Sequence, residues 1–541
     1  MDVNGAAATR RARGRIVMLV DNGVRGDSRV QKTARSAAEA GWEVILLGRQ
    51  TDPAESSFRL GDAEVRLLPV PTDVNYPSLF RRRSLRRPLA YPAGSRHLNY
   101  RLASVQAWRA DLVARSAALR TGSTGGLAGL VGRGRIAVGR AAATLLDKWV
   151  RFRARETRRL REVRQSPDSL LNRIPVAFWT TVMGDRSWRR LDPSLWSWEL
   201  AYGRVIDQLE PDLIHAHDVK MIGVGARAAL RARARGRPVR FVWDAHEYVP
   251  GLRPLAAWWL PAQVAHEREY ARYADAVVTV STALADLLRA DHKLPEQPTV
   301  VMNAPVTRLS EEELAAPVPD LRALCGIDRD TPLLAYSGGI NPVRGVDLVV
   351  EALPSLPGVH VAMLSLHPSG RNKPADELYE RAERLGVADR VHLLPYVPHW
   401  QVSRVLAAAD AAVSPLHHLP NHEIALSNKF FEYSHARLPL VVSDVRTMSE
   451  VVRSTGQGEV FRAQDLADFV RAVKLVLADP ERYRAAYDRP GLLEEWSWEA
   501  QAEILDRLYA RLLPQAPPRQ HPGVGDPGSA VSGPAMAATG A

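Results

Sequence analysis

Short apolar runs alternate with amphipathic stretches along most of this chain, a pattern typical of strands and helices that follow one another in turn. Residues 15–20 and 42–47 are apolar runs of strand length, and a helix that begins near residue 27 lies between them. Two strands joined by one helix form a βαβ unit with parallel strands. Further strands are expected at residues 64–70, 212–216, 239–243 and 276–280. The first half of the chain is therefore expected to fold around a mostly parallel sheet.

A second series of strands begins after Asn303 and a connection that contains proline. Its members are residues 333–337, 359–364, 391–394, 411–416 and 439–444. Two successive α/β series predict two domains with a cleft between them. The expected divisions are a disordered N-terminus (1–14), a first domain (15–305) with an insert at about 80–165, a linker (306–330), a second domain (331–495), a C-terminal helix (496–513) and a disordered tail (514–541).

The segment between the last two expected strands carries polar side chains at the start of a helix. Ser427 is a plausible N-cap, which puts Asn428 and Lys429 in the first turn and Glu432 one turn further along. Free N–H groups and a partial positive charge make a helix start suitable for a phosphate, and Glu432 can accept a hydrogen bond from a sugar hydroxyl. Each residue alone also fits ordinary capping or a solvated helix face, so the combination carries the interpretation.

Composition limits the classes of protein to which the chain can belong. It has 541 residues, of which 46% are hydrophobic and 24% charged, and a single cysteine. One cysteine excludes an intramolecular disulfide and a cysteine-rich metal site, and it favours a reducing compartment. The first strand is not preceded by an apolar stretch of signal-peptide length, and no apolar run is long enough to span a membrane. We therefore expect a cytoplasmic protein.

The net charge of +12 comes from one region of the chain. Residues 81–165 contain 21 Lys or Arg and four acidic residues, a surplus of 17, so the remainder carries −5. Such a run is often a solvated face. It can also meet anions, either phospholipid headgroups with Trp149 and Phe152 as interfacial anchors, or a phosphorylated acceptor. Nucleic acid is less favoured, because no zinc-finger spacing or RRM-type aromatic motif accompanies the charge.

Ligands of open parallel sheets gather beyond the carboxyl ends of the strands, so the residues there are candidates for a site. The first such loop, residues 21–29, has two glycines but not the GxGxxG dinucleotide motif. The clusters His215-Ala-His217-Asp218 and Asp244-Ala-His246-Glu247 follow two later strands without the spacing of a zinc site. Asp328-Arg-Asp330 spells an acid-x-acid metal motif, but it precedes a strand, where acids commonly make turns. No required metal is expected.

The polar helix start resembles the donor-binding stretch of retaining glycosyltransferases of family 4, which have the GT-B fold. That family's signature is a Glu, seven residues and a second Glu, often with an Asn-Lys pair before the second. Asn428, Lys429 and Glu432 match its second half, and residues 438–442 match the strand that follows. Ile424 stands at the first-Glu position, so Glu423, one residue away, becomes the candidate contact to the donor sugar.

The same resemblance implies roles for residues elsewhere. It implies that the fold is α/β, with two Rossmann-like doubly wound domains facing a cleft. His246 would lie near the donor sugar and phosphate, and Arg344 stands where the family has a lysine that holds the diphosphate. The resemblance also implies donor contacts at Gly338, Gly339, which replaces an expected arginine, and Val397, near the nucleotide base, and cleft contacts at Gly26 and Arg29.

Together these observations favour transfer of a sugar from a nucleoside-diphosphate donor to a hydroxyl acceptor, with retention at the anomeric carbon and without a cofactor. Arg344, Lys429 and N–H groups at the helix start would stabilise the departing diphosphate. A glycan, a glycolipid or a polysaccharide precursor is the expected acceptor, in the cytoplasm at the inner face of the cell membrane. The alternative is a noncatalytic GT-B-like binding protein that docks on a membrane or polyanion through the basic insert.

Overall fold

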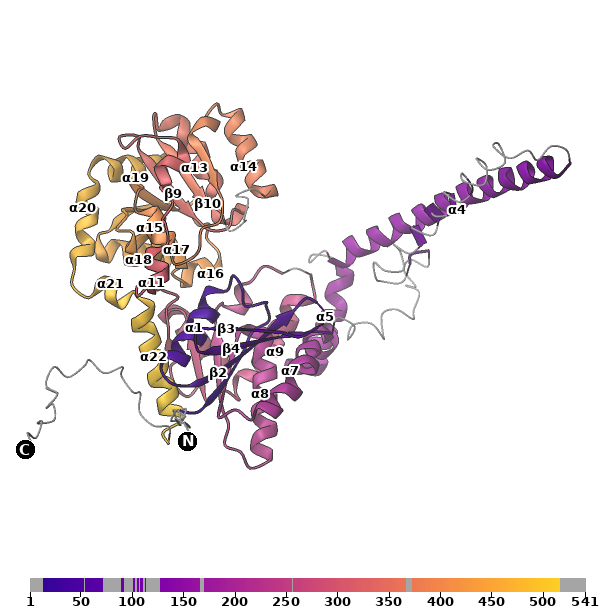
Figure 1. Ribbon diagram of the computed structural model, residues 1–541, viewed down its shortest axis with the longest axis horizontal. Helices are drawn as coiled ribbons and strands as arrows, with labels where there is room; N and C mark the ends of the chain where they lie inside the picture. The colour runs from indigo at the N-terminus through magenta and orange to yellow at the C-terminus, as the bar shows by residue number, and fades with distance from the viewer. Residues whose placement is uncertain are drawn as a thin grey trace, which may run out of the picture.

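The computed structural model places two α/β domains one above the other, with a long helix reaching away from them (Figure 1). It describes residues 13–515 apart from 53, 72–88, 92–100, 103–104, 107, 110–111, 113–126, 166–169, 255 and 366–371. The predictions of disorder at 1–14 and 514–541 fall almost entirely outside these residues. Among the helices that the structure describes, none combines the length and apolarity needed to cross a bilayer.

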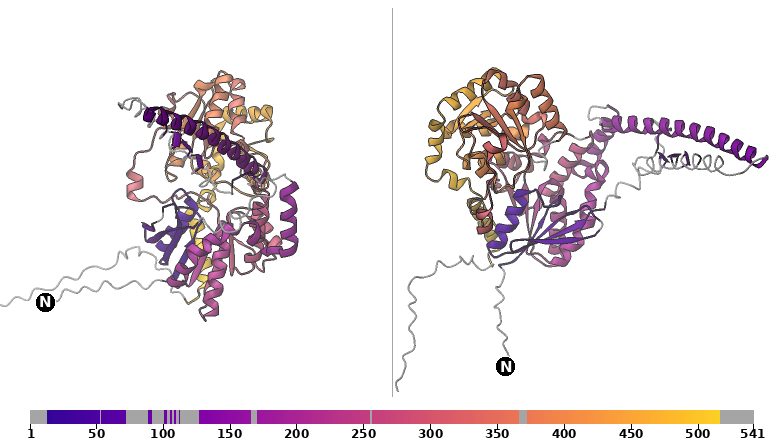
Figure 2. Two further views of the ribbon diagram at one scale, coloured as in Figure 1. Left: turned by 90° about the vertical axis from the view of Figure 1, so that its right-hand side faces the viewer. Right: turned by 45° about the horizontal axis from the view of Figure 1, so that its top comes forward.

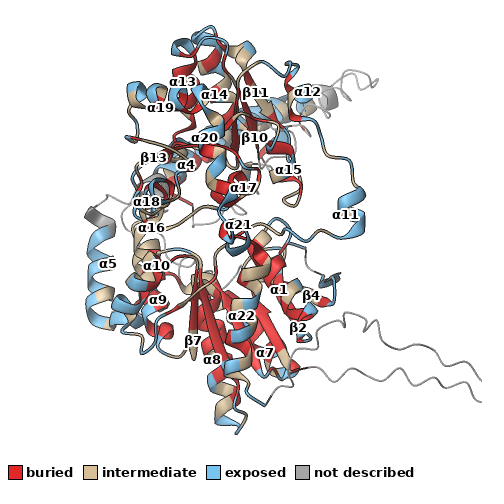
Figure 3. Cartoon of the chain, turned by 90° about the vertical axis from the view of Figure 1, so that its left-hand side faces the viewer, coloured by how far each residue is buried: buried red, intermediate tan, exposed pale blue. Residues whose placement is uncertain are grey.

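The N-terminal domain is built on an eight-stranded sheet in the order β3-β4-β2-β1-β5-β6-β7-β8. All neighbours are parallel except β3, which pairs antiparallel with β4 at one edge. The strands are β1 (Arg15–Leu19), β2 (Glu43–Gln50), β3 (Ser56–Leu60), β4 (Ala63–Pro69), β5 (Leu213–His217), β6 (Arg240–Ala245), β7 (Ala276–Thr279) and β8 (Thr299–Val300). The central strands are almost fully buried, which explains their continuous apolar runs (Figure 3).

Helices cover both faces of this sheet and extend beyond it. They are α1 (Ser28–Glu39), α4 (Leu127–Gln165), α5 (Leu170–Met183), α6 (Trp188–Leu191), α7 (Trp196–Leu209), α8 (Asp218–Ala234), α9 (Trp259–Ala271) and α10 (Thr282–His292). The charged stretch of the basic region belongs to one long helix, α4, which already begins at Leu127 and contains several glycines in its first half. Three consecutive alanines at 141–143, which have high helix propensity, lie between these glycines and the charged second half.

The C-terminal domain has a six-stranded, fully parallel sheet in the order β11-β10-β9-β12-β13-β14. The strands are β9 (Leu333–Ser337), β10 (His360–Leu364), β11 (Val391–Leu394), β12 (Ala411–Ser414), β13 (Leu440–Ser443) and β14 (Gly458–Phe461). The helices are α11 (Glu311–Ala315), α12 (Leu321–Cys325), α13 (Val346–Ala352), α14 (Lys373–Arg384), α15 (Val402–Leu406), α16 (Pro420–Ile424), α17 (Asn428–His435), α18 (Arg446–Thr455), α19 (Leu466–Ala478), α20 (Pro480–Arg484), α21 (Leu492–Glu495) and α22 (Trp498–Leu512). This arrangement is the expected GT-B architecture of two Rossmann-like domains.

The last helix ties the end of the chain back to its beginning. α22 leaves the C-terminal domain and crosses to the N-terminal one (Figure 1). There Trp498, Leu505, Leu508 and Tyr509 are buried in the same apolar cluster as residues of β1 and α1. The Tyr509 hydroxyl lies 2.6 Å from Nδ1 of His215 in the middle of β5. The helix therefore packs against the N-terminal sheet itself.

Candidate functional site

A cleft of about 1090 Å³ lies between the two domains. It is bordered by the loops after β1, β6, β9 and β11 and by the start of α17. These loops follow carboxyl ends of parallel strands in both sheets, where open α/β folds bind ligands. Ten of the predicted site residues line the cleft: Gly26, Arg29, His246, Gly338, Gly339, Arg344, Val397, Asn428, Lys429 and Glu432.

The start of α17 brings several polar side chains to the cleft wall. Phe430, Phe431 and Tyr433 are buried and anchor the helix in its domain. Ser427 occupies the N-cap position as predicted, but its side chain makes no capping bond, and its buried hydroxyl has no hydrogen-bond partner. First-turn N–H groups without a side-chain cap are available to an anionic ligand in the cleft.

Lys429 brings a buried ammonium group to this helix start. Its Nζ donates to the Tyr336 hydroxyl at 3.1 Å and lies 4.2 Å from the centre of that ring. Burial and the nearby Arg344 guanidinium lower the pKa of Lys429 well below its usual value. Gly338 has a φ of +115°, and a Cβ there would lie 3.3 Å from Nζ, so glycine leaves room for the lysine. A bound diphosphate would bring negative charge to this desolvated ammonium.

Glu432 lies one turn after Asn428 and also faces the cleft. Its carboxylate accepts a hydrogen bond from the Ser337 hydroxyl at 3.1 Å. Burial raises the pKa of Glu432. The carboxylate still has acceptor capacity for the hydroxyl groups of a ligand.

Arg344 is held at the end of a short 3-10 turn, Pro342–Arg344. The Asn341 side chain caps this turn by accepting from the Arg344 backbone N–H at 3.2 Å. Gly345 follows with a φ of +66°, and a Cβ at this position would come within 1.9 Å of the Pro415 carbonyl oxygen. The backbone therefore packs too closely for any other residue, which fixes where the Arg344 side chain begins.

His246 is engaged by carboxylates on both sides. Nδ1 lies 3.2 Å from Asp218 and Nε2 lies 3.2 Å from Asp244. Burial alone would lower the pKa of His246, but the two carboxylates outweigh it and raise the pKa from 6.5 to about 10. The ring is thus cationic at neutral pH, and both of its N–H groups already have acceptors. The resemblance implied only that His246 lies near the donor sugar and phosphate, and the carboxylates on its two sides were not foreseen.

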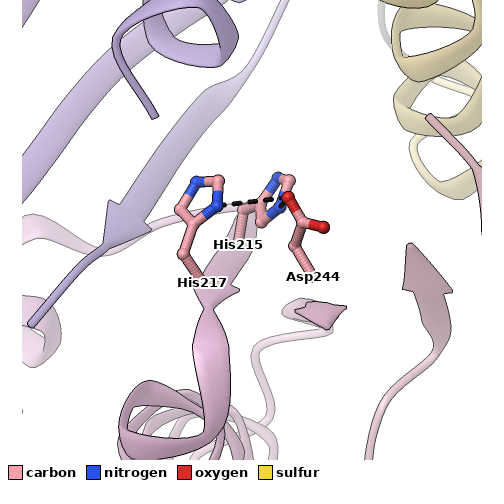
Figure 4. A group of neighbouring side chains, drawn as sticks. All are labelled: His215, His217 and Asp244. Carbon is pink, nitrogen blue, oxygen red and sulfur yellow. Dashed lines mark ion pairs between the residues drawn. The ribbon is translucent and has the colours of Figure 1, made fainter. Parts of the chain in front are cut away.

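A group of residues behind His246 has the composition of a metal site (Figure 4). His215, His217 and Asp244 are all buried, and their potential ligand atoms lie within 4.8 Å of one another. However, Arg29 donates to both oxygens of Asp244, at 2.9 and 3.0 Å. A divalent ion there would have to displace or face a buried guanidinium, so these residues do not fit a metal.

The same ion pair defines the position of Arg29. Its guanidinium also donates to the Val301 carbonyl at 2.7 Å and is buried. Arg29 therefore reaches the cleft wall with three of its five N–H groups engaged by Asp244 and the Val301 carbonyl. Gly26 lies in the loop just before it, at a φ of +90°, where a Cβ would meet no other atom within 4 Å.

Glu423 is the predicted site residue that does not line the cleft. The loop after β12 folds into the short helix α16, and the Glu423 carboxylate there lies 2.5 Å from Nδ1 of His418 and accepts from the Arg446 backbone N–H at 2.7 Å. The neighbouring His422 lines the cleft instead. Successive residues of a helix do not share a face, so Glu423 points away from the cleft, and Ile424, which stands at the first-Glu position, is buried and does not line the cleft either.

Residues of α16 that join the two domains were not predicted from the sequence. Asn421 accepts from the Tyr248 backbone N–H at 2.7 Å and donates to the Tyr248 carbonyl at 3.0 Å. Ile424 is buried in the core cluster of the N-terminal domain. Nothing in the local sequence marks these residues, because their partners lie more than 140 positions away.

Four further charged residues line the cleft without having been predicted as part of the site. They are Asp27 and the exposed residues Arg25, Glu247 and Arg253. Although the Glu247 side chain is exposed to the cleft, desolvation of its carboxyl group by the surrounding walls, together with the neighbouring Asp218, raises its pKa. Glu247 directly follows His246, so its position after a strand was the available signal.

Two family models match the chain, one in each domain. The model described as glycosyl transferases group 1 matches residues 319–489, and the model described as Glycosyltransferase Family 4 matches residues 152–307. The first lies over the C-terminal sheet and α17, and the second covers β5, β6 and β7 with their helices.

Curated relatives match part of the chain at moderate identity. A D-inositol 3-phosphate glycosyltransferase of Segniliparus rotundus is 29% identical over 198 residues, 36% of this chain and 42% of the relative. A glycogen synthase of Mycobacterium tuberculosis is 30% identical over 180 residues, 32% of this chain and 42% of that protein. The chain thus spans less than half the length of these relatives.

Solved structures share the two-domain architecture. A sucrose-phosphate synthase from Thermosynechococcus elongatus aligns with a TM-score of 0.58 at 16% identity, over 93% of this chain and all of the other. HepE of Anabaena in complex with UDP and glucose aligns with a TM-score of 0.52 at 13% identity, over 92% of this chain and 100% of that one. The C-terminal domain therefore matches the glycosyl transferases group 1, the N-terminal domain matches Glycosyltransferase Family 4, and the two domains together have the GT-B fold.

Proposed function

We propose that the protein transfers a sugar from a nucleoside-diphosphate donor to a hydroxyl group of an acceptor, with retention of the anomeric configuration. The observation that carries the proposal is the start of α17. There, buried Lys429, uncapped N–H groups and Glu432 face one cleft together with Arg344. This set provides cations and donors for a diphosphate and an acceptor for sugar hydroxyls around the same helix start.

The chemistry follows from where charge develops. As the bond from the anomeric carbon to the diphosphate oxygen breaks, negative charge grows on the phosphate. Lys429 and Arg344 would stabilise this charge more in the transition state than in the ground state, which accelerates departure. Because these side chains supply the positive charge, we propose that transfer needs no metal ion, and that a chelator leaves its rate unchanged.

Retention is proposed to proceed by attack from the face that the diphosphate leaves. Among the described residues of the cleft wall, the carboxylates are Asp27, Glu247 and Glu432. Asp27 already accepts from Asn22 and from the Val30 backbone N–H, at 2.8 and 3.2 Å, and Glu432 is assigned to the donor. Glu247→Gln therefore tests for a protein nucleophile. Retained configuration with substantial activity in this variant supports front-face attack, whereas loss of all transfer points to a covalent intermediate.

The acceptor side of the proposal concerns the N-terminal domain. Arg25 and Arg253 bring exposed cations to the cleft. One matching relative is named for inositol 3-phosphate, an anionic acceptor. We propose a glycan, glycolipid or polysaccharide precursor as the acceptor here, used in the cytoplasm at the inner face of the cell membrane.

A panel of nucleotide sugars tests the proposal directly. Each is tried for thermal stabilisation of the full chain, and those that bind are incubated with cell extract and the products analysed by mass. One donor should stabilise the protein, and its sugar should appear on a new product with the donor's anomeric configuration. Stabilisation without turnover in any extract would support a noncatalytic binding protein, and no stabilisation by any donor would refute both hypotheses.

A further inference from the structure

The helix α4 presents an apolar stripe to solvent over most of its length. It has 39 residues, about 58 Å at 1.5 Å per residue, and extends away from both domains (Figures 1 and 2). The exposed apolar residues Val131, Val138, Leu145, Trp149 and Phe152 follow one another at intervals of seven, seven, four and three. These intervals keep them on one face of a helix.

The stripe is not the face by which α4 packs within its own chain. Ala143, Val150, Ala154 and Thr157 are buried and form a separate face, and the Thr157 hydroxyl accepts from the Tyr91 backbone N–H at 2.9 Å. This face is turned by roughly a third of a revolution from the stripe at 3.6 residues per turn. The helix thus packs within its own chain on one face, while the side chains of the stripe keep 38–71% of their surface exposed.

Two aromatic side chains form the widest part of the stripe. Trp149 is 47% exposed and Phe152 38% exposed, and their rings stack at 5.8 Å between centres. The next helix, α5, repeats the feature with Ile174, Phe178 and Val182, which are 55–67% exposed at a spacing of four residues. Exposed apolar residues in such rows on two successive helices mark an interaction surface.

The charge of α4 selects the kind of partner. The helix contains eleven Lys or Arg and three acidic residues. Arg140, Lys148, Arg155 and Arg158 are exposed on a third face, separate from both the stripe and the covered face. If α4 paired with α4 of a second protein molecule, two helices that each carry a net charge of +8 would meet, and their repulsion opposes such pairing. An anionic surface that also accepts apolar side chains matches both features.

We propose that α4, together with α5, lies on an anionic phospholipid surface, with the apolar stripe in the boundary between headgroups and acyl chains and the cations among the headgroups. A cationic polar face together with an apolar face of Trp, Phe and Leu is the signature of interfacial helices. The inference concerns a surface away from the cleft and does not depend on the proposed transfer. It gives the protein a fixed orientation relative to a membrane.

Sedimentation with vesicles tests the proposal on the full chain without any donor. Vesicles of phosphatidylglycerol and phosphatidylcholine in equal parts should carry the protein down at low salt, and vesicles of phosphatidylcholine alone should not. Replacing Trp149→Ser and Phe152→Ser together should lower partitioning by about tenfold or more, because binding scales with the apolar area that enters the interface. The control is Leu314→Ser with Leu475→Ser, two exposed leucines of the other domain.

The charge is tested separately. Replacing Arg140, Lys148, Arg155 and Arg158 with Gln should weaken partitioning by about a hundredfold or more, since each surface cation contributes about fivefold. The control replaces the exposed Arg329, Arg384, Lys474 and Arg489 of the C-terminal domain with Gln and should change little.

Several results would overturn the inference. Undiminished sedimentation of the stripe variant, or equal binding to neutral vesicles, would remove the lipid surface as the partner. Self-association in the absence of vesicles that the stripe variant abolishes would make a second copy the occupant. Thermal stabilisation by nucleotide sugars should be the same in the wild type and the stripe variant, so failure of vesicle binding and failure of the proposed function are separately observable.

Discussion

Replacing Lys429 with Met should lower the proposed transferase activity without lowering the stability of the protein. The ammonium is buried and desolvated, and its pKa is well below the usual value. Met has a similar length and fills irregular apolar space without a charge. The Tyr336 hydroxyl, which loses the lysine as a donor, still donates to the Gly339 carbonyl at 2.8 Å. We therefore expect the unliganded variant to be at least as stable as the wild type.

The expected loss of activity follows from the distance at which the charges would meet. An ammonium about 3 Å from a phosphate oxygen gains about 5 kcal/mol at an effective dielectric constant of about 20. Part of this offsets the cost of keeping Lys429 charged away from water. Removal of a single preorganised donor typically costs about 3–4 kcal/mol in the transition state. We expect kcat/KM to fall by about a hundred- to a thousandfold.

The assay combines transfer rates, thermal unfolding and donor affinity against pH. Donor phosphates raise the lowered pKa of Lys429, so binding takes up a proton and donor affinity falls as pH rises between the free and bound pKa values. This dependence should be absent in Lys429→Met. The matched control is Lys474→Met on the exposed side of α19, which should behave as the wild type. A Lys429→Met protein with full activity and unchanged donor stabilisation would refute the assignment.

Three further substitutions test other parts of the cleft. Glu432→Ala should lower kcat/KM for the donor by about ten- to a hundredfold, because that is what hydrogen bonds to a charged acceptor contribute. The unfolding temperature should change little, because only the Ser337 hydroxyl loses a hydrogen-bond partner. Transfer kinetics and thermal scans measure these two effects. Gly345→Ala should destabilise the C-terminal domain by about 3 kcal/mol or more, measured in urea, because its Cβ would overlap the Pro415 carbonyl. The raised pKa of His246 contributes stability that is full below pH 6.5 and lost as pH rises to about 10, so the wild type should lose stability over that range more steeply than His246→Gln.

Each of these substitutions has an internal comparison. Glu450→Ala removes an exposed glutamate of the same domain and should leave donor use intact. Gly386→Ala places a side chain at a φ of +67° with nothing within 4 Å, so it carries the backbone strain of Gly345→Ala without the overlap and should cost only about 1 kcal/mol. Equal losses at the two glycines would contradict the packing argument. For His246, parallel pH curves for wild type and variant would show that the carboxylates do not hold the charged ring.

Hydrophobic patterning alone located most of the two sheets. The strand predictions at residues 15–20 and 333–337 overlap β1 and β9 almost completely, because strands buried on both faces read as continuous apolar runs. Three of the four edge strands were missed, whereas β11 was predicted at residues 391–394. β3 is largely exposed and β8 has two residues, so neither carries an apolar run to detect. The third, β14, also lies at the edge of its sheet.

The site was predicted where its features are local. The start of α17 follows from a Ser, an Asn-Lys pair and a Glu within six residues, and the structure places these side chains on the cleft. The direction of the Glu423 side chain could not be predicted from neighbouring residues, because it depends on how its loop folds into the short helix α16. The domain contact of Asn421 with Tyr248 joins residues 173 positions apart.

The amino-acid sequence by itself determined the succession of strands and helices, the position of the polar helix start and the location of the positive charge, because each depends on neighbours within a turn or a strand. Tertiary structure decided which charges are free. Arg29 and Asp244 lie 215 positions apart, and their pairing engages the Arg29 guanidinium, while the carboxylates of Asp218 at the start of α8 and Asp244 in β6 raise the pKa of His246 to about 10. Burial and ion pairing depend on every group that approaches in space, and the spacing of residues along a chain does not contain that information.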